Sequence, residues 1–265
     1  MATGALDDRG GYDTDLTDAQ WARIELLVPA PRLGPNPFKY DRRTIVNAMI
    51  YKCRTGCSWR LLPNDFPPWE AVAKYFYQWR DDGTWERLLN HLREEARQKD
   101  GRERQPSLGI VDSQSVKTTS VGGEHGFDGG KKVKGRKRHI LVDILGFLVA
   151  VLVTTASMQD RDALPDLLRL GRRQSSRLEK VLVDGAYNGD VIEQASIASG
   201  IKVEVVKRSD CIPGFVPVPN RWVVERSFGW LNHWRQLSKE YDRTTASSES
   251  WIRIAFTNIT LRRLA

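Results

Sequence analysis

Cysteine, histidine and long apolar runs are all scarce in this chain of 265 residues. Three cysteines, an odd number, with no leading signal-peptide pattern argue against a disulfide framework, so we expect a reducing compartment, the cytoplasm. The four histidines are too scattered to form a site. The longest apolar stretch, residues 140–156, is interrupted by Asp143 and Gly146 and alternates like a β-hairpin, so no transmembrane segment is expected.

The positive charge of the chain is concentrated in one part of it. Residues 1–100 hold 15 Lys/Arg and 15 Asp/Glu, whereas residues 101–265 hold 26 and 18, so the whole excess of +8 lies in the second part. A hydrophobic content of 40% is enough for a globular core. A basic globular region suits a polyanionic partner, and nucleic acid is the commonest one.

The hydrophobic pattern changes from helical to mixed at a polar segment, residues 101–107. Before it, we predict helices from Thr17 and at 42–55, 69–79 and 84–98. After it, we predict strands at 108–116, 138–145, 147–155, 179–184 and 202–207, and helices at 160–173, 188–199, 219–240 and 250–264. The expected fold class is α/β: a mixed five-stranded sheet flanked by helices, preceded by a small all-helical domain. The predicted domains are residues 1–100 and 108–265, with 101–107 as a linker.

Two strand-like apolar runs end in the same way, each with an aspartate. Asp112 follows Gly-Ile-Val, and Asp184 follows Val-Leu-Val. Because sites in open α/β sheets collect at the carboxyl ends of strands, neighbouring strands would place the two carboxylates side by side. Such carboxylates repel each other unless a cation lies between them, so the pattern predicts a divalent metal. Either aspartate alone is more typical of a turn or a helix cap.

A third acid is available on the predicted helix 219–240. Val224, Phe228 and Leu231 form its apolar stripe, and Glu225 lies at the border of that stripe. Arg221 is one turn earlier, in the weaker orientation for a helical ion pair, so its guanidinium is interpreted as either a structural partner or a phosphate contact.

These acids and their surrounding residues resemble the DDE triad of insertion-sequence transposases with an RNase H-like catalytic domain. Asp112, Asp184 after 71 intervening residues and Glu225 after 40 more fit the short-spacing group of that family. The segments Val-Asp-Ser-Gln-Ser-Val-Lys-Thr, Val-Asp-Gly-Ala-Tyr and Arg-Trp-Val-Val-Glu-Arg-Ser-Phe-Gly-Trp-Leu are similar to its motifs. The helical front section resembles the family's N-terminal DNA-binding domain.

The resemblance implies an activity, a cofactor and partners. Asp112, Asp184 and Glu225 would be the catalytic residues and the ligands of two Mg²⁺ ions, for which Mn²⁺ would substitute. The enzyme would cleave the 3′ ends of its element at the terminal inverted repeats and transfer them into target DNA, acting on DNA as a homodimer or larger assembly. The family's Tyr-Arg-Glu-Lys signature is incomplete, because Val218 and Asn232 occupy the Tyr and Lys positions; His233 or Arg235 would replace the lysine.

A run of basic residues follows the first predicted strand. Gly129 and Gly130 precede six cations, Lys131, Lys132, Lys134, Arg136, Lys137 and Arg138. We expect a flexible loop that contacts the phosphate backbone without reading sequence, although a solvated surface loop is the ordinary alternative.

In the front section, the helix 69–79 is a candidate recognition helix of a helix-turn-helix, with Lys74, Gln78 and Arg80 as candidate DNA contacts. The alternative is a small bundle that serves packing or dimerisation, which its zero net charge favours. For the whole chain, two other functions stay open: a non-enzymatic, domesticated DNA-binding protein, or an RNase H-like nuclease that does not join ends.

Overall fold

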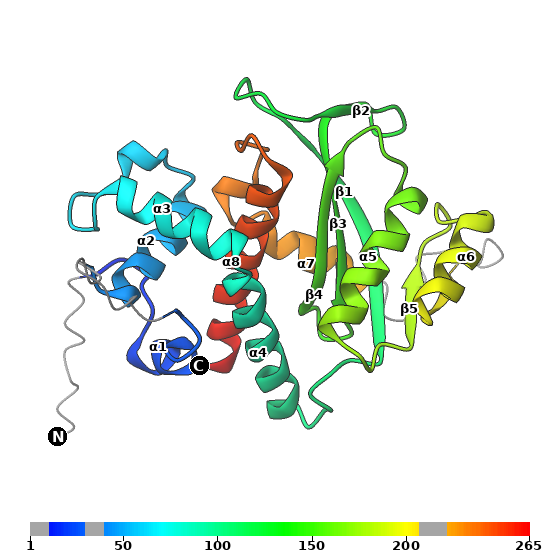
Figure 1. Cartoon of the computed structure of the whole chain (residues 1–265), viewed down its shortest axis with the longest axis horizontal. Coiled ribbons are helices and arrows are strands. Elements are labelled where there is room, and N and C mark those ends of the chain that lie inside the picture. Colours follow the sequence, from blue (N-terminus) through cyan, green and yellow to red (C-terminus); the bar gives the residue numbers. More distant parts are fainter. Residues whose placement is uncertain (1–10, 30–39, 207–221) are drawn as a thin grey trace, which may run out of the picture.

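A computed structural model describes residues 11–29, 40–206 and 222–265. Five helical segments come first, followed by a region of strands and helices (Figure 1). The elements of the helical region are α1 (Asp18–Ile24), α2 (Arg42–Thr55), the 3₁₀ helix η1 (Trp59–Leu61), α3 (Trp69–Asp81) and α4 (Thr84–Lys99). The elements of the second region are β1 (Leu108–Lys117), β2 (Gly126–Asp128), β3 (Val133–Asp143), β4 (Leu148–Thr155), α5 (Asp160–Gln174), β5 (Lys180–Val183), α6 (Asp190–Ser199), β6 (Lys202–Val205), α7 (Trp222–Leu231), the 3₁₀ helix η2 (Arg235–Leu237) and α8 (Thr245–Leu264).

The strands form one mixed sheet around β1. On one side, β1 pairs with β3 in antiparallel register; on the other, it pairs with β5 in parallel register, and β6 lies parallel to β5. The far side of β3 pairs with β4 and, at its beginning, with β2. All five expected strands are present, while β2 is an additional strand that the sequence did not predict.

Alternate residues of the strands enter two different cores. Ile110, Ile140 and Leu182 belong to a cluster that includes the buried residues of α7 and α8. Val111 and Leu141, one position along, belong to a second cluster that includes the buried residues of α5 and α6. Since side chains alternate across a strand, the sheet is covered by α7 and α8 on one face and by α5 and α6 on the other. This arrangement confirms the expected α/β class, with helices on both faces and a helical region before the sheet.

The helical region is closed by a helix from the end of the described chain. Helix α8 packs against α2, α3 and α4 as well as against β4, and it lies between the N-terminal helices and the sheet in Figure 1. Its Trp251 stacks on Phe76 of α3, with ring centroids 4.2 Å apart, and also contacts Trp59. The apolar residues of the helical region and of the α7 and α8 face therefore form one continuous core.

Most predicted helix ends are confirmed because local capping interactions determine them. Thr17 and Gln20 form a capping box at α1, and Gly56 ends α2 in the left-handed conformation with φ of 69°.

The predicted long helix 219–240 is wrong. Its described part ends at Leu231, and the carbonyl of His233 then accepts a hydrogen bond from Arg54. Among the helices described, none has the length and apolar character needed to cross a bilayer.

Candidate active site

Asp112 and Asp184 lie on neighbouring parallel strands. The register of β1 and β5 pairs Gly109 with Val181 and Ile110 with Leu182. Extending this register by two residues brings Asp112, in the middle of β1, level with Asp184, which directly follows the end of β5. Adjacent strands in a sheet are about 4.8 Å apart, so the two backbones bring the carboxylates into the same small region.

Both aspartates continue the face of the sheet on which α7 packs. Ile110 and Leu182 point into the cluster that contains Val224 of α7, and each aspartate comes two residues after one of them. Local hydrogen bonds orient the two carboxylates. Oδ1 of Asp112 accepts from the backbone N–H of Ser113 at 2.7 Å, and Oδ1 of Asp184 accepts from that of Ala186 at 2.9 Å. The second contact is an Asx turn, which bends the chain as it leaves β5.

Glu225 stands on the first turn of α7, with its side chain exposed. The predicted stripe of Val224, Phe228 and Leu231 is buried, so the helix is oriented as its pattern indicated. Within the described part of the chain, however, no group of three or more His, Cys, Asp or Glu side chains is arranged to hold a metal ion. The register brings the two aspartates level with each other, and the part of Glu225 as a third metal ligand stays a prediction.

A buried tyrosine lies beside the two aspartates. Tyr187 is 1% exposed, and its hydroxyl has no hydrogen-bond partner among the residues described. Burial raises the pKa of Tyr187 well above its ordinary value, and the negative charges of Asp160, Asp112 and Asp184 raise it further. Tyr187 was not predicted as a site residue from the sequence, although it belongs to the Val-Asp-Gly-Ala-Tyr segment.

Behind the aspartates, a buried lysine joins two further acids. The Nζ of Lys137 lies 3.0 Å from Asp160 and 3.5 Å from Asp128. Burial opposes ionisation of Asp128, but hydrogen bonds from Ser115 and from the backbone of Lys131, with the charges of both lysines, outweigh it and lower its pKa to about 2. This network contacts β1 at Ser115, whose hydroxyl donates to Asp128 at 2.6 Å. No pattern in the sequence indicated it, because its members come from separate elements.

The basic run 131–138 is largely a strand, and the expected flexible loop is wrong. Residues from Val133 onward belong to β3, and Arg136, Lys137 and Arg138 are buried. Arg138 lies 2.5 Å from Glu240, and Arg136 lies 3.6 Å from the same carboxylate. Since each of the three buried cations already has a carboxylate partner, they are not placed to contact a phosphate backbone.

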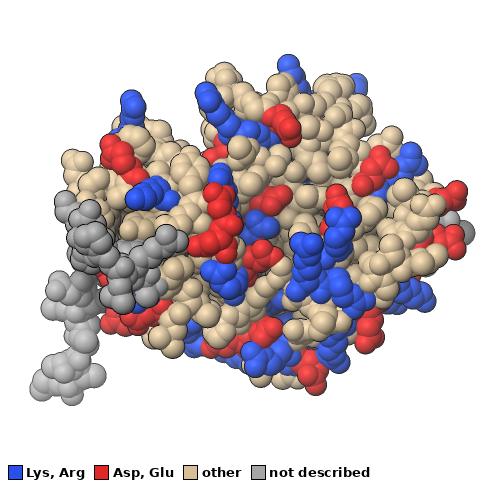
Figure 2. Space-filling view, viewed as in Figure 1, with Lys and Arg blue, Asp and Glu red and all other residues tan. Residues whose placement is uncertain are grey.

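Other predicted DNA-contact residues differ in their accessibility. Lys131 and Lys132 are exposed at the turn between β2 and β3, and Lys134 is exposed at the start of β3, whereas Arg221 lies outside the described residues. On α3, Lys74 is exposed and Gln78 is partly exposed. Arg80 pairs with its neighbour Asp81 at 2.7 Å and donates to Ser247 at 3.1 Å. On the face shown in Figure 2, acidic and basic side chains are interspersed, so that face has no large region of a single sign.

Family comparisons extend over both regions of the chain. Residues 16–89 match a family model described as "Putative transposase of IS4/5 family", and residues 103–259, more than half of the chain, match the model "Transposase DDE domain".

Among curated proteins, the "Uncharacterized protein y4sN" of Sinorhizobium fredii is 32% identical over 81 residues, which are 31% of this chain and 65% of that protein. The "Putative transposase for insertion sequence element IS402" of Burkholderia cepacia is 31% identical over 116 residues, 41% of this chain and 54% of that protein. The chain therefore spans less than two thirds of the length of these relatives. Among solved structures, a Mos1 transposase paired-end complex with the left transposon end is similar at 12% identity and a TM-score of 0.25, covering 66% of this chain and 61% of that chain. By the match over residues 103–259, this chain belongs to the family of proteins with a transposase DDE domain.

Proposed function

We propose that this protein cleaves the 3′ ends of an insertion sequence at its terminal inverted repeats and transfers those ends into target DNA. The observation that carries the proposal is the register of the parallel strands β1 and β5, which, extended by two residues, sets Asp112 of β1 level with Asp184 just after β5. The family match over residues 103–259 adds that such a domain is a transposase domain.

The donor chemistry of these residues fits hard divalent cations. Asp112 and Asp184 supply carboxylate oxygens from adjacent strands, and Glu225 on α7 would complete the set. Two Mg²⁺ ions, or Mn²⁺ in their place, would activate the attacking oxygen and stabilise the leaving one. The protein itself orients the aspartates through the N–H groups of Ser113 and Ala186. We propose that Glu225, exposed on the first turn of α7, is the third ligand of this site.

The rest of the proposal concerns partners and domain roles. We propose that residues 1–100 bind the terminal repeats, with Lys74 and Gln78 of α3 as contacts, and that residues 108–265 carry the chemistry after a connecting segment, 101–107. Lys131, Lys132 and Lys134 are exposed cations near the sheet end and suit a nonspecific phosphate contact. Holding two element ends together requires a homodimer or larger assembly, acting in the cytoplasm on nucleoid DNA.

The decisive variant is Asp112→Asn, tested on labelled duplex DNA that carries the inverted repeats flanking the gene. We expect cleavage in Mg²⁺ or Mn²⁺ to fall by roughly 10³-fold, since loss of a carboxylate that would hold the metal ions removes several kcal/mol of transition-state stabilisation. Binding of the same DNA in a gel-shift assay should not change. Asp166→Asn, an exposed acid paired with Arg169 on α5, is the matched control and should cleave like the unaltered protein.

The outcomes separate the rival functions. A protein that binds the repeats but cuts them in neither metal is a non-enzymatic DNA-binding protein. One that cuts them but never joins a 3′ end to target DNA is a nuclease without strand transfer. If Asp112→Asn cleaves the DNA as fast as the unaltered protein, the proposed active site is refuted.

A further inference from the structure

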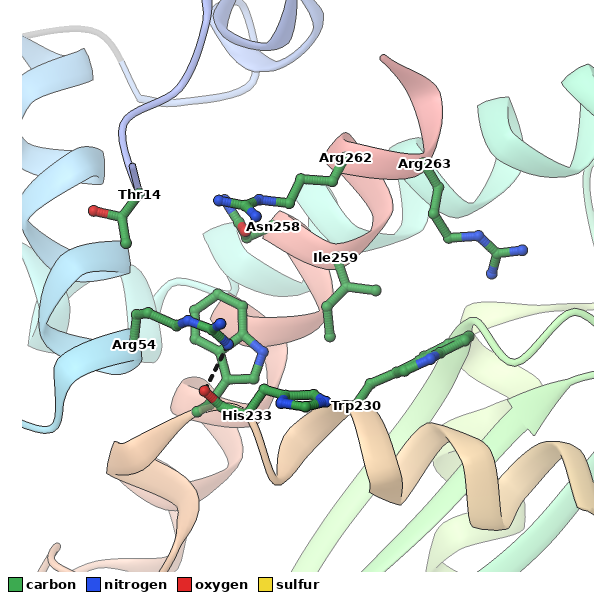
Figure 3. A pocket seen from close by; sticks show the side chains of 9 residues that line it. Thr14, Arg54, Trp230, His233, Asn258, Ile259, Arg262 and Arg263 are labelled. Atoms are coloured by element: carbon green, nitrogen blue, oxygen red, sulfur yellow. Dashed lines mark hydrogen bonds between the residues drawn. The ribbon is translucent and has the colours of Figure 1, made fainter. Parts of the chain in front are cut away.

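A cavity of about 550 Å³ lies away from the paired aspartates, where the helical region meets the end of α7. Arg54 of α2 and Arg262 of α8 extend into it from different elements, and the rings of Trp230 and His233 lie along its α7 side (Figure 3). Its other lining residues are Thr14, Trp234, Asn258, Ile259 and Arg263, so the described lining contains three arginines and no acidic side chain. Ligand pockets in proteins are typically of this volume.

The arginines of this region have no carboxylate partner among the residues that the structure describes. Among the residues described, Arg54, Arg226, Arg262 and Arg263 form no ion pair with Asp or Glu. Each donates instead to a backbone carbonyl: Arg54 to His233 at 2.6 Å, Arg262 to Asp13 at 2.7 Å, and Arg226 and Arg263 to Leu145 at 2.8 and 3.2 Å. A carbonyl contact leaves the guanidinium charge in place, so four positive charges remain available to an anion.

Aromatic rings alternate with these cations along the exposed side of α7. The guanidinium of Arg226 lies 4.6 Å from the ring of Trp222 and 4.9 Å from that of Trp230. Arg263 lies 5.3 Å from Trp230 on the other side. We call these four residues the tryptophan–arginine ladder. Trp222 is 49% exposed, so one end of the ladder is open to a ligand.

The ladder connects the third acid to the cavity. Glu225 is three residues after Trp222 and directly before Arg226, and Trp230 lines the cavity eight residues after Trp222. At 1.5 Å per residue, the two tryptophans are separated by about 12 Å along the helix axis. A ligand that followed the ladder would pass Glu225 and enter the cavity.

From these contacts we infer that the ladder and its cavity bind unpaired nucleotides of a DNA strand, with bases on the indole faces and phosphates on Arg54 and Arg262. Aromatic faces interleaved with uncompensated cations are what single-stranded nucleic acid requires, because every base has a face to stack and every phosphate a charge to neutralise. A site that bound only a small anion would require the arginines but not a half-exposed tryptophan such as Trp222. This inference rests on the proposed function, to which it adds a path for the strand near the cleavage site.

The test uses a fluorescein-labelled 12-residue oligothymidylate, with binding followed by anisotropy in EDTA at several NaCl concentrations. The variant Arg54→Gln/Arg262→Gln removes two phosphate contacts. Each contact on a single strand contributes about 0.7 to the salt exponent, or roughly fivefold between 1 M and 0.1 M salt. We therefore expect about 25-fold weaker binding at 0.1 M NaCl and a salt exponent smaller by about 1.4.

A matched control removes the same charge elsewhere. Arg104→Gln/Arg169→Gln neutralises two exposed arginines that pair with Glu94 and Asp166 and do not line the cavity. This variant should bind the oligonucleotide within about twofold of the unaltered protein. Equal binding by the two double variants would overturn the inference. Circular dichroism of both variants checks that the fold is retained.

Base stacking is tested separately at Trp230 and Trp222. Leucine at either position should weaken oligonucleotide binding by roughly 5- to 150-fold, whereas Trp230→Phe, which keeps an aromatic face, should lose much less. If both leucine variants bind normally, or if polyphosphate of equal charge competes as well as the oligonucleotide, base recognition is refuted. Because these assays contain no divalent metal, they stand apart from the cleavage test of Asp112→Asn. Either result can fail while the other holds.

Discussion

His139 on β3 makes the stability of this protein depend on pH in a window that can be calculated. Its Nε2 lies 3.0 Å from the hydroxyl of Thr154, and its Nδ1 has no hydrogen-bond partner in the part of the chain that the structure describes. Burial lowers the pKa of His139 from 6.5 to about 4; the charges of Lys137 and Lys131 add to this effect, and that of Asp160 opposes it. The folded imidazole is therefore neutral at pH 7.

The sign follows from the two pKa values. Below pH 6.5 the unfolded chain takes up a proton on His139 that the folded chain does not bind until about pH 4. The contribution of the neutral His139 to the free energy of unfolding is therefore fully present above pH 6.5 and decreases as the pH falls from 6.5 to about 4. At 1.36 kcal/mol per pKa unit, the loss between pH 7.5 and pH 4.5 is about 2 to 3 kcal/mol from this residue.

Urea unfolding followed by tryptophan fluorescence measures this loss. The unaltered protein should lose about 2 to 3 kcal/mol more than His139→Gln between pH 7.5 and pH 4.5. Taking the difference between the two proteins cancels the contribution of other titrating groups. His91→Gln, at an exposed position on α4, is the control and should behave like the unaltered protein. Equal pH dependence in the unaltered protein and His139→Gln would refute a buried, neutral imidazole.

Two further predictions concern the interior. Glu240→Gln leaves Arg136 and Arg138 buried without a counter-charge, so the free energy of unfolding in urea should fall by about 3 to 5 kcal/mol. Glu204→Gln, which breaks an exposed ion pair, should lower it by less than about 1 kcal/mol. Similar losses in the two variants would contradict the stabilising role of the buried carboxylate. Gly135→Ala places a methyl group against a backbone carbonyl oxygen of β1, and we expect a lower melting temperature; an unchanged value would mean that the strands can separate there at little cost.

Local signals in the sequence were sufficient for much of the fold. The capping box at Thr17 and the glycine at position 56 determine helix ends through contacts a few residues away, so both could be predicted. The apolar runs before Asp112 and Asp184 likewise predicted two buried parallel strands, and β1 and β5 are neighbours. Their relative register could not be predicted, because it depends on pairing between segments 72 positions apart.

The predictions that were wrong concern segments whose structure depends on contacts between residues far apart in the sequence. Charged residues at 136–138 resemble a solvated loop until Glu240, about 100 residues later, is brought beside them. The same contacts shorten the predicted helix after Leu231, because Arg138 donates to the carbonyl of Leu237 at 2.8 Å. Tyr187 was overlooked for a related reason, since only the folded chain brings Asp160 to it.

The position of α8 affects how this polypeptide can mature. During translation, residues 11–100 emerge from the ribosome long before residues 245–264 are synthesised. Phe76 of α3 and the helices around it, however, are buried against Trp251 of α8. The apolar surface of α2, α3 and α4 that packs on α8 therefore stays exposed until synthesis is nearly finished. A nascent chain that stalls before Thr245 would expose apolar surface in its first hundred residues and become a target for chaperones or proteases.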